Sequence, residues 1–308
     1  MSISSSSPGK LMLFGEHAVV YGGPCIVTAV NKRLMVSMSE TTDGKVMIDA
    51  PKVNNTKFVE SAIVHGCRAW GITHHGLAVK TESSFSDTFG FGSSSAVTVS
   101  ALMSLAALYK KAPTKKELFD VAYETVLDVQ KVGSGFDVAA AVFGSTIKYQ
   151  NKGEVIEPLH IDTSTVELVV GYSGVKADTV AIVKQIAEKK EKYGEAVNKI
   201  FEAIGALVVE AEKAMKEGDW VRVGTLMNFN QEYLRDLGVS TEKLESMISG
   251  AKKAGAYGAK LSGAGGGDCI IALVSKDKRK VVEEAITAAG GEVMDATWNS
   301  EGARIELT

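Results

Sequence analysis

Cysteine is scarce in this chain of 308 residues, which contains three. Cys25, Cys67 and Cys269 are widely spaced and form neither a CxxC pair nor a cluster with histidine. This spacing excludes the usual structural zinc sites, and an odd number of separated thiols is typical of a reducing compartment. We therefore expect a cytoplasmic protein.

Long apolar runs and an excess of positive charge are also lacking. No run reaches the roughly 18 residues that a membrane-spanning helix needs, and residues 1–15 show no charged-then-apolar signal pattern. The net charge is -3, the isoelectric point is about 6.0 and aromatic residues make up 7%. This composition offers no basic surface to nucleic acid or an anionic membrane, so we expect neither as a partner, and any bound anion must be held locally.

The best-known phosphate-binding motifs are absent, because the sequence contains no GxxxxGKS or GxxxxGKT and no HRD or DFG set. Three glycine-rich turns are present instead, at residues 90–95, 133–135 and 263–267. The first, GFGSSS, leads into a helix-like run, and a helix N-terminus has free N–H groups and a partial positive charge that attract phosphate. Taken alone, this turn fits an ordinary helix capped by serine better than a phosphate site.

Strand-like and helix-like segments are mixed along the chain without the strict alternation of a doubly wound sheet, which favours an α+β fold. One helix-like segment follows a plausible N-cap at Thr114. The expected strands are residues 10–15, 25–30, 34–40, 45–50 and 76–83, and the expected helices are residues 58–71, 95–110 and 114–130. A second unit is expected to begin near residues 166–174.

A later helical stretch carries an apolar stripe that we assign to the core: Val197, Ile200, Ile204, Val208, Ala211 and Met215. The charged residues 187–195 before it are typical of a solvated helix face. Cys269 lies inside an apolar strand and is expected to be buried. Four histidines show no spacing that indicates a metal site or a triad, and we expect them on the surface or in loops: His65, His74, His75 and His160.

Three blocks of the sequence together resemble the three motifs of the GHMP small-molecule kinases, in the same order and at the same spacing: SPGKLMLFGEHAVVYGG, FGFGSSSAVTVSA and KLSGAGGGDCIIAL. The resemblance covers nearly the whole chain. It implies a two-domain α+β fold, with a ribosomal-S5-like domain over residues 1–165 that holds ATP on its Gly/Ser loop, and a ferredoxin-like domain over residues 166–308. It also implies ATP and Mg²⁺ as cofactors, a small-molecule acceptor in the cleft between the domains, and a possible homodimer.

The same resemblance points to the mevalonate pathway, where two kinds of member compete. GKLMLFGEHAVVYGGP is similar to mevalonate kinases, whereas QKVGSGFDVAAAVFGS is similar to phosphomevalonate kinases. Mevalonate kinases carry a magnesium-binding glutamate eleven residues before their catalytic aspartate, and that position here is Val126. We therefore expect a phosphomevalonate kinase, which converts mevalonate 5-phosphate to the 5-diphosphate. The alternative is a kinase of the 5-hydroxyl of mevalonate or mevalonate 3-phosphate, and a non-catalytic sensor with the same fold is a remote one.

The resemblance assigns roles to individual residues. Asp137 matches the aspartate that orients or deprotonates the attacking oxygen, and Lys10 matches the lysine beside it, which offsets charge on the transferring group. From the residues alone, Asp137 fits a helix N-cap equally well. The expected ATP-binding residues are Gly90, Gly92, Ser93, Ser94, Ser95, Gly265 and Gly266, with Ser93 or Ser94 on Mg²⁺. The expected acceptor-binding residues are Glu16, His17, Lys131, Ser134, Lys176, Gly263 and Ala264.

Overall fold

The computed structural model describes residues 2–51, 56–86 and 88–306 and combines two β-sheets with eight α-helices in that part of the chain. The strands are β1 (Ser2–Phe14), β2 (Cys25–Glu40), β3 (Val46–Asp49), β4 (Leu77–Ser83), β5 (Thr146–Gln150), β6 (Val155–Pro158), β7 (Val166–Tyr172), β8 (Gly258–Ser262), β9 (Cys269–Ser275), β10 (Glu292–Met294) and β11 (Arg304–Glu306). The helices are α1 (Lys57–Trp70), α2 (Ser93–Leu108), α3 (Lys115–Gln130), α4 (Phe136–Phe143), α5 (Thr179–Glu217), α6 (Trp220–Asp236), α7 (Glu242–Lys253) and α8 (Arg279–Ala288). The expected α+β fold is confirmed.

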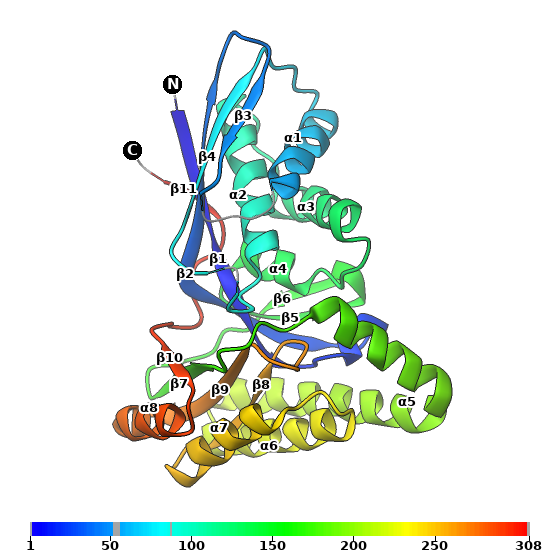
Figure 1. The fold of residues 1–308 in the computed structure, drawn as a ribbon, viewed down its shortest axis with the longest axis vertical. Coiled ribbons are helices and arrows are strands. Elements are labelled where there is room, and N and C mark those ends of the chain that lie inside the picture. Colours follow the sequence, from blue (N-terminus) through cyan, green and yellow to red (C-terminus); the bar gives the residue numbers. More distant parts are fainter. Residues whose placement is uncertain (1, 52–55, 87, 307–308) are drawn as a thin grey trace.

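The first sheet has seven strands in the order β11-β1-β2-β4-β3, and β5 and β6 extend it from β2. Most neighbours are antiparallel, but β3 and β4 run parallel. Helices α1 to α4 lie together on one face of this sheet (Figure 1). The strands expected at residues 25–30 and 34–40 are in fact one strand, β2, because it pairs with β1 on both sides of an irregularity between Pro8 and Lys10.

The second sheet has four antiparallel strands in the order β10-β7-β9-β8. Alternate residues of these strands face different neighbours. Val170 and Ile271 belong to a core that is continuous with the first sheet, whereas Val169 and Ile270 pack with α7 and α8. The C-terminal β11 returns to the first sheet, where it pairs with β1.

Several helix predictions are confirmed in detail. Thr114 caps α3 and forms a reciprocal capping box with Glu117. The stripe from Val197 to Met215 lies on α5, and all its members are buried except the half-buried Ile200. Cys269 is also buried. The prediction for His65 is wrong: this residue of α1 is buried, because its side chain packs against the acidic residues of α3.

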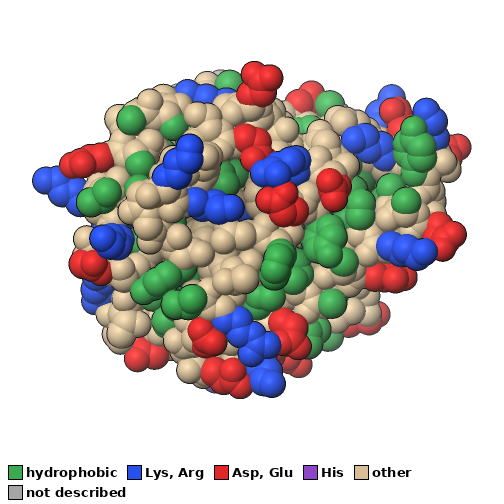
Figure 2. Space-filling model, turned by 90° about the horizontal axis from the view of Figure 1, so that it is seen from below, with side chains coloured by type: hydrophobic (Ala, Val, Ile, Leu, Met, Phe, Trp, Pro, Cys, Tyr) green, Lys and Arg blue, Asp and Glu red, His purple; other side chains and the backbone are tan. Residues whose placement is uncertain are grey.

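The surface of the α5–α8 half carries charges of both signs. Seen from below, blue and red side chains are interspersed, with apolar side chains between them (Figure 2). Residues 187–195, expected as a solvated face, lie on α5 and most of them are exposed. Within the described parts of the chain, no helix combines the length and the apolar character needed to cross a membrane.

Candidate active site

The first glycine-rich turn forms a loop at the start of α2. Gly90 and Gly92 have φ angles of 70° and 76°, which residues with side chains rarely adopt, and Gly92 is the N-cap of the helix. The serines therefore do not cap α2, and the interpretation of this turn as a helix capped by serine is wrong. Ser93, Ser94 and Ser95 form its first turn, where backbone N–H groups lack intrahelical partners. Such a helix start suits a phosphate group.

Lys10 and Asp137 both lie next to Gly92. A Cβ atom built on Gly92 would lie 3.3 Å from Lys10 Cε and 3.6 Å from Asp137 Cβ. The Lys10 ammonium donates a hydrogen bond to the Gly90 carbonyl at 2.8 Å and lies 5.5 Å from the centre of the Phe136 ring. The fold thus brings the lysine of β1, the glycine loop and the aspartate of α4 together from three distant parts of the sequence.

Asp137 is the second residue of α4, and the N-cap is Gly135. The interpretation of Asp137 as an N-cap is therefore wrong. Its Oδ2 accepts a hydrogen bond from the Ser95 hydroxyl at 2.7 Å, and its Oδ1 accepts one from the Val138 N–H at 3.0 Å. Ser95 is 1% exposed, so its hydroxyl orients this carboxylate, while Ser93 and Ser94 are only half-buried.

The third glycine-rich turn owes its composition partly to packing. A Cβ atom on Gly265 would lie 2.3 Å from the Val239 carbonyl oxygen, and one on Gly266 would lie 2.5 Å from Ile182. The Gly266 N–H already donates to the Val239 carbonyl at 2.7 Å. Gly263 differs, because a Cβ atom there would meet nothing within 4 Å. Close approach to neighbouring backbone explains Gly265 and Gly266, and open space surrounds Gly263.

Asp268 is a site residue that the sequence analysis did not identify. It has a φ angle of 55° and is 8% exposed, and its Oδ1 accepts a hydrogen bond from the Ala177 N–H at 2.9 Å. Its Oδ2 is so close to Gly90 that a Cβ atom on that glycine would lie 2.5 Å away. Burial raises the pKa of Asp268, and the positive charges of Lys10 and Lys176 oppose the rise. The sequence feature that could have identified Asp268 is its position directly after a run of glycines.

The first motif turns sharply at His17. Its Nε2 lies 2.9 Å from the Ala264 carbonyl oxygen, so the loops of the first and third motifs meet there. Burial lowers the pKa of His17 to about 4. Glu16 is 1% exposed and forms an ion pair with Lys260, which is 0% exposed. Burial raises the pKa of Glu16 and lowers that of Lys260, and their mutual attraction opposes both shifts.

The other residues expected to bind the acceptor are Lys131, Ser134 and Lys176, and their contacts differ from those of Glu16 and His17. Lys131 is 76% exposed at its side chain and lies 3.4 Å from Asp128. The Ser134 carbonyl accepts a hydrogen bond from the Tyr149 hydroxyl. Lys176 precedes Ala177, whose N–H contacts Asp268, and its charge acts on that carboxylate.

Helix α3 supplies no carboxylate to the phosphate loop. Val126 is 2% exposed and packs in the core. Its acidic neighbours face α1: Glu124 bonds to Arg68 at 2.8 Å, and Asp128 lies 3.5 Å from His65. Among the described residues, no group of three or more His, Cys, Asp and Glu side chains is arranged to hold a metal ion.

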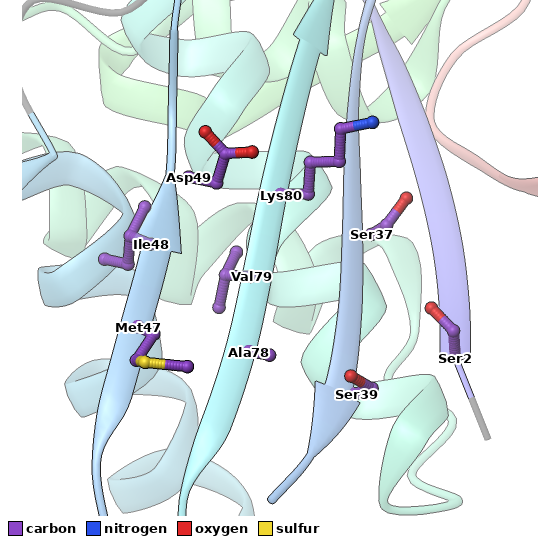
Figure 3. Close-up of a pocket in the computed structure, with 9 residues that line it drawn as sticks. All are labelled: Ser2, Ser37, Ser39, Met47, Ile48, Asp49, Ala78, Val79 and Lys80. Carbon is purple, nitrogen blue, oxygen red and sulfur yellow. The ribbon is translucent and has the colours of Figure 1, made fainter.

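A shallow pocket on the first sheet is a separate feature. It is lined by residues of β1, β2, β3 and β4, including Ser37, Met47 and Lys80. Figure 3 shows these side chains in front of the strands, with the helices behind them. The pocket therefore lies on the face turned away from α2 and contains none of the glycine loops.

Comparison with known proteins agrees with this arrangement. The model of the GHMP kinases N terminal domain matches residues 57–145, and that of the GHMP kinases C terminal matches residues 211–292. The mevalonate kinase of Pyrococcus furiosus is 33% identical, over 99% of this chain and 99% of its own length. The chain belongs to the GHMP kinase family. It is therefore an ATP-dependent phosphotransferase.

Solved structures confirm the fold of this GHMP kinase. The crystal structure of L. major mevalonate kinase in complex with R-mevalonate has a TM-score of 0.83 and 25% identity, and covers 96% of this chain and 95% of its own. That of Streptococcus pneumoniae phosphomevalonate kinase has a TM-score of 0.84 and 19% identity, and covers 97% and 99%. The sequence relatives favour the mevalonate kinase alternative over the phosphomevalonate kinase that we expected first.

Proposed function

We propose that this GHMP kinase is a mevalonate kinase, which transfers the γ-phosphoryl group of ATP to the 5-hydroxyl of mevalonate. The observation that carries the proposal is the 33% identity to a mevalonate kinase over 99% of both chains. The absence of an acidic residue at Val126 led to the opposite expectation. Val126 packs in the core and remains a departure from the mevalonate kinase pattern.

The geometry suits transfer to a hydroxyl group. Asp137 is held by Ser95 beside the phosphate loop, where its carboxylate accepts the proton of the attacking hydroxyl. Lys10 and the first turn of α2 offset negative charge on the group in transfer. We assign Gly90, Gly92, Ser93 and Ser94 to the ATP phosphates, since a Cβ on Gly92 would fill the space beside Lys10.

Magnesium fits the oxygen-rich donors at this loop. The half-buried hydroxyls of Ser93 and Ser94 are hard oxygen ligands, which Mg²⁺ uses together with phosphate oxygens and water. When bound, the ion neutralises charge on the β- and γ-phosphates. In this proposal, the chain holds the metal with hydroxyl groups and without a carboxylate from α3.

Burial and the Ala264 contact fix the protonation state of His17. A carbonyl oxygen only accepts hydrogen bonds, so the Nε2 of His17 carries the proton that it donates to Ala264. With its pKa lowered to about 4, the ring is neutral near pH 7 and its Nδ1 is an acceptor. Such a nitrogen can receive a hydrogen bond from a hydroxyl group of the acceptor, which mevalonate and mevalonate 5-phosphate both carry.

The direct test is ADP release by the purified protein with ATP and Mg²⁺, run in parallel on mevalonate, mevalonate 3-phosphate and mevalonate 5-phosphate. We expect the highest kcat/KM with mevalonate. A preference for the 5-phosphate would return the enzyme to the phosphomevalonate kinases, and activity on none of the three would remove it from this group of kinases.

Asp137→Asn tests the assigned proton acceptor. The amide keeps the hydrogen bond from Ser95 but cannot take a proton, so we expect kcat to fall at least about 100-fold while ATP binding is retained. Steady-state kinetics and calorimetric titration with ATP measure the two effects. Near-normal kcat would exclude Asp137 from proton transfer.

A further inference from the structure

The backbone at His17 adopts a strained turn. Its φ and ψ angles are 61° and -45°, and the Ala18 N–H donates to the Glu16 carbonyl at 2.7 Å. A hydrogen bond between residues two apart, with a positive φ at the middle residue, defines the rare and strained hand of γ-turn. Such conformations persist only where the surrounding structure holds them, and they are concentrated at functional sites.

Two side-chain contacts hold this turn. The His17 imidazole bonds to the Ala264 carbonyl, and the Glu16 carboxylate bonds to the Lys260 ammonium. Lys260 lies on β8, the strand that leads into the loop containing Ala264, and it also donates to the Leu261 carbonyl at 2.6 Å. The ion pair therefore joins the first residue of the turn to the element that positions the partner of His17.

Stability alone does not account for this pair. Lys260 and Glu16 are 0% and 1% exposed, and the desolvation of two such charges offsets most of their attraction. Glu16 Oε2 is buried and has no hydrogen-bond partner among the described residues, which adds to the cost. A well-packed apolar pair would serve the core at least as well. The position of the charges beside a strained turn points to a geometric role.

We propose that Lys260 is a positioning residue of the acceptor site: its ion pair with Glu16 holds the strained turn, so that the His17 imidazole stays on the Ala264 carbonyl. The inference rests on the proposed function in one respect, because it takes His17 to lie at the acceptor. The charged group that acts on the imidazole is Lys260, the partner of Glu16. Lys260 opposes protonation of His17, and burial does so more strongly.

Lys260→Met is the first variant, because it keeps the length of the apolar stem and removes the charge. With the turn released, we expect KM for the acceptor to rise roughly tenfold or more while KM for ATP changes less than about twofold. The assay uses whichever of the three mevalonate compounds the unaltered enzyme phosphorylates. The inference about Lys260 can therefore be tested even if the enzyme's substrate is not mevalonate.

Nitrogen-15 NMR of the histidine side chains gives a readout that needs no substrate. In the unaltered protein we expect His17 with a protonated Nε2, an unprotonated Nδ1 and a pKa of about 4. In Lys260→Met the positive charge that disfavours protonation is gone, so the pKa of His17 should rise and its tautomer signature should change. A lysine that acts on His17 through its charge alone would also raise the pKa but would leave the tautomer signature unchanged, so the tautomer reports the positioning role.

Two further variants keep the test interpretable. Glu16→Gln/Lys260→Met carries no unpaired buried charge, so it supplies the measurements if the single variant does not fold, and we again expect a raised acceptor KM. Lys148→Met is the matched control, since it breaks the half-buried ion pair between β5 and Glu212 of α5. It should leave the His17 signals and both KM values as they are. Unchanged His17 signals and acceptor KM in the Lys260 variants would overturn the proposal.

Discussion

Buried histidine makes the stability of this kinase depend on pH. The pKa of His17 falls from 6.5, its ordinary value, to about 4 in the folded protein. Between these values the unfolded chain binds a proton that the folded chain does not, so the free energy of unfolding decreases as pH falls from about 6.5 to 4. Lowering the pKa from 6.5 to about 4 corresponds to about 3 kcal/mol of stability at neutral pH.

Urea denaturation of the unaltered protein and of His17→Gln at pH 7, 5.5 and 4 measures this contribution. Glutamine does not titrate, so the variant should lose about 3 kcal/mol less between pH 7 and pH 4 than the unaltered protein does. Both proteins share the contributions of all other titrating groups. Parallel pH profiles would show that His17 is not held neutral in the folded state.

Contact between Gly90 and Asp268 predicts a second effect at the scale of single residues. In Gly90→Ala the new methyl group meets the Asp268 carboxylate and must also adopt a φ of 70°. We expect the phosphate loop to shift and KM for ATP to rise about tenfold. Kinetics with varied ATP measure the change.

Gly218→Ala is the matched control for that substitution. Gly218 has a φ of 72° at the end of α5, but nothing lies within 4 Å of its would-be Cβ atom. Its loss of stability should be about 1–2 kcal/mol, which is the cost of backbone strain alone, and KM for ATP should not change. Equal KM values for ATP in Gly90→Ala and Gly218→Ala would mean that the contact with Asp268 does not position the phosphate loop.

At the scale of elements, a seam of serine hydroxyls joins β1 to α2. The Ser5 and Ser104 hydroxyls are 2.8 Å apart, Ser5 donates to the Ser100 carbonyl, and Ser104 donates to the Val36 carbonyl at 2.8 Å. All three serines are buried. The small side chains let the helix approach the sheet closely, and their hydrogen bonds satisfy the polar groups that this approach buries.

Ser104→Ala tests the seam. The change removes the hydroxyl that donates to the Val36 carbonyl, so we expect the free energy of unfolding to fall by about 1–3 kcal/mol. Ser249→Ala, on the exposed face of α7, makes the same change in helix propensity without losing a buried hydrogen bond. Urea denaturation measures the loss of unfolding free energy in each variant, and the difference between the two losses gives the contribution of the buried hydrogen bond. Equal losses would show that the serine seam does not stabilise the fold.

Local periodicity allowed prediction of the helices but not of this seam. The cap at Thr114 and the stripe on α5 follow from residue spacing. The serines of β1 have no apolar alternation, so only the first motif's apolar residues indicated a strand, and the observed strand begins at Ser2. Hydroxyls from two distant segments satisfy one another in the fold, and a pattern along one segment does not contain that information.

The same limit applies to the candidate site across the whole molecule. The glycine loop was found from its own composition, whereas the roles of Lys10 and Asp137 came from the family motifs. Lys260 and Asp268 were missed because their partners lie in other motifs, Glu16 for the lysine and Gly90 for the aspartate. The proposed division into domains at residues 1–165 and 166–308 likewise depends on contacts that a linear pattern does not give.

The two proposed domains share one core and one sheet, which makes their independence testable. Residues of β7, β9, α5 and α6 belong to the same apolar cluster as β1 and β2, and β11 pairs with residues 4–6 of β1. The Arg33 guanidinium also donates to the carbonyls of Glu301 and Gly302, each at 2.8 Å. A fragment of residues 1–165 would expose this face of its core and lose the neighbour of β1.

We therefore expect the fragment of residues 1–165 to lack a cooperative urea transition and a native near-ultraviolet circular dichroism spectrum. Because the missing contacts come from the rest of the chain, addition of a fragment of residues 166–308 should restore both signals and kinase activity. Circular dichroism of the separate and mixed fragments measures this. A sharp transition in the first fragment alone would mean that the first sheet is a self-sufficient folding unit and that β11 and the shared core contribute only to docking.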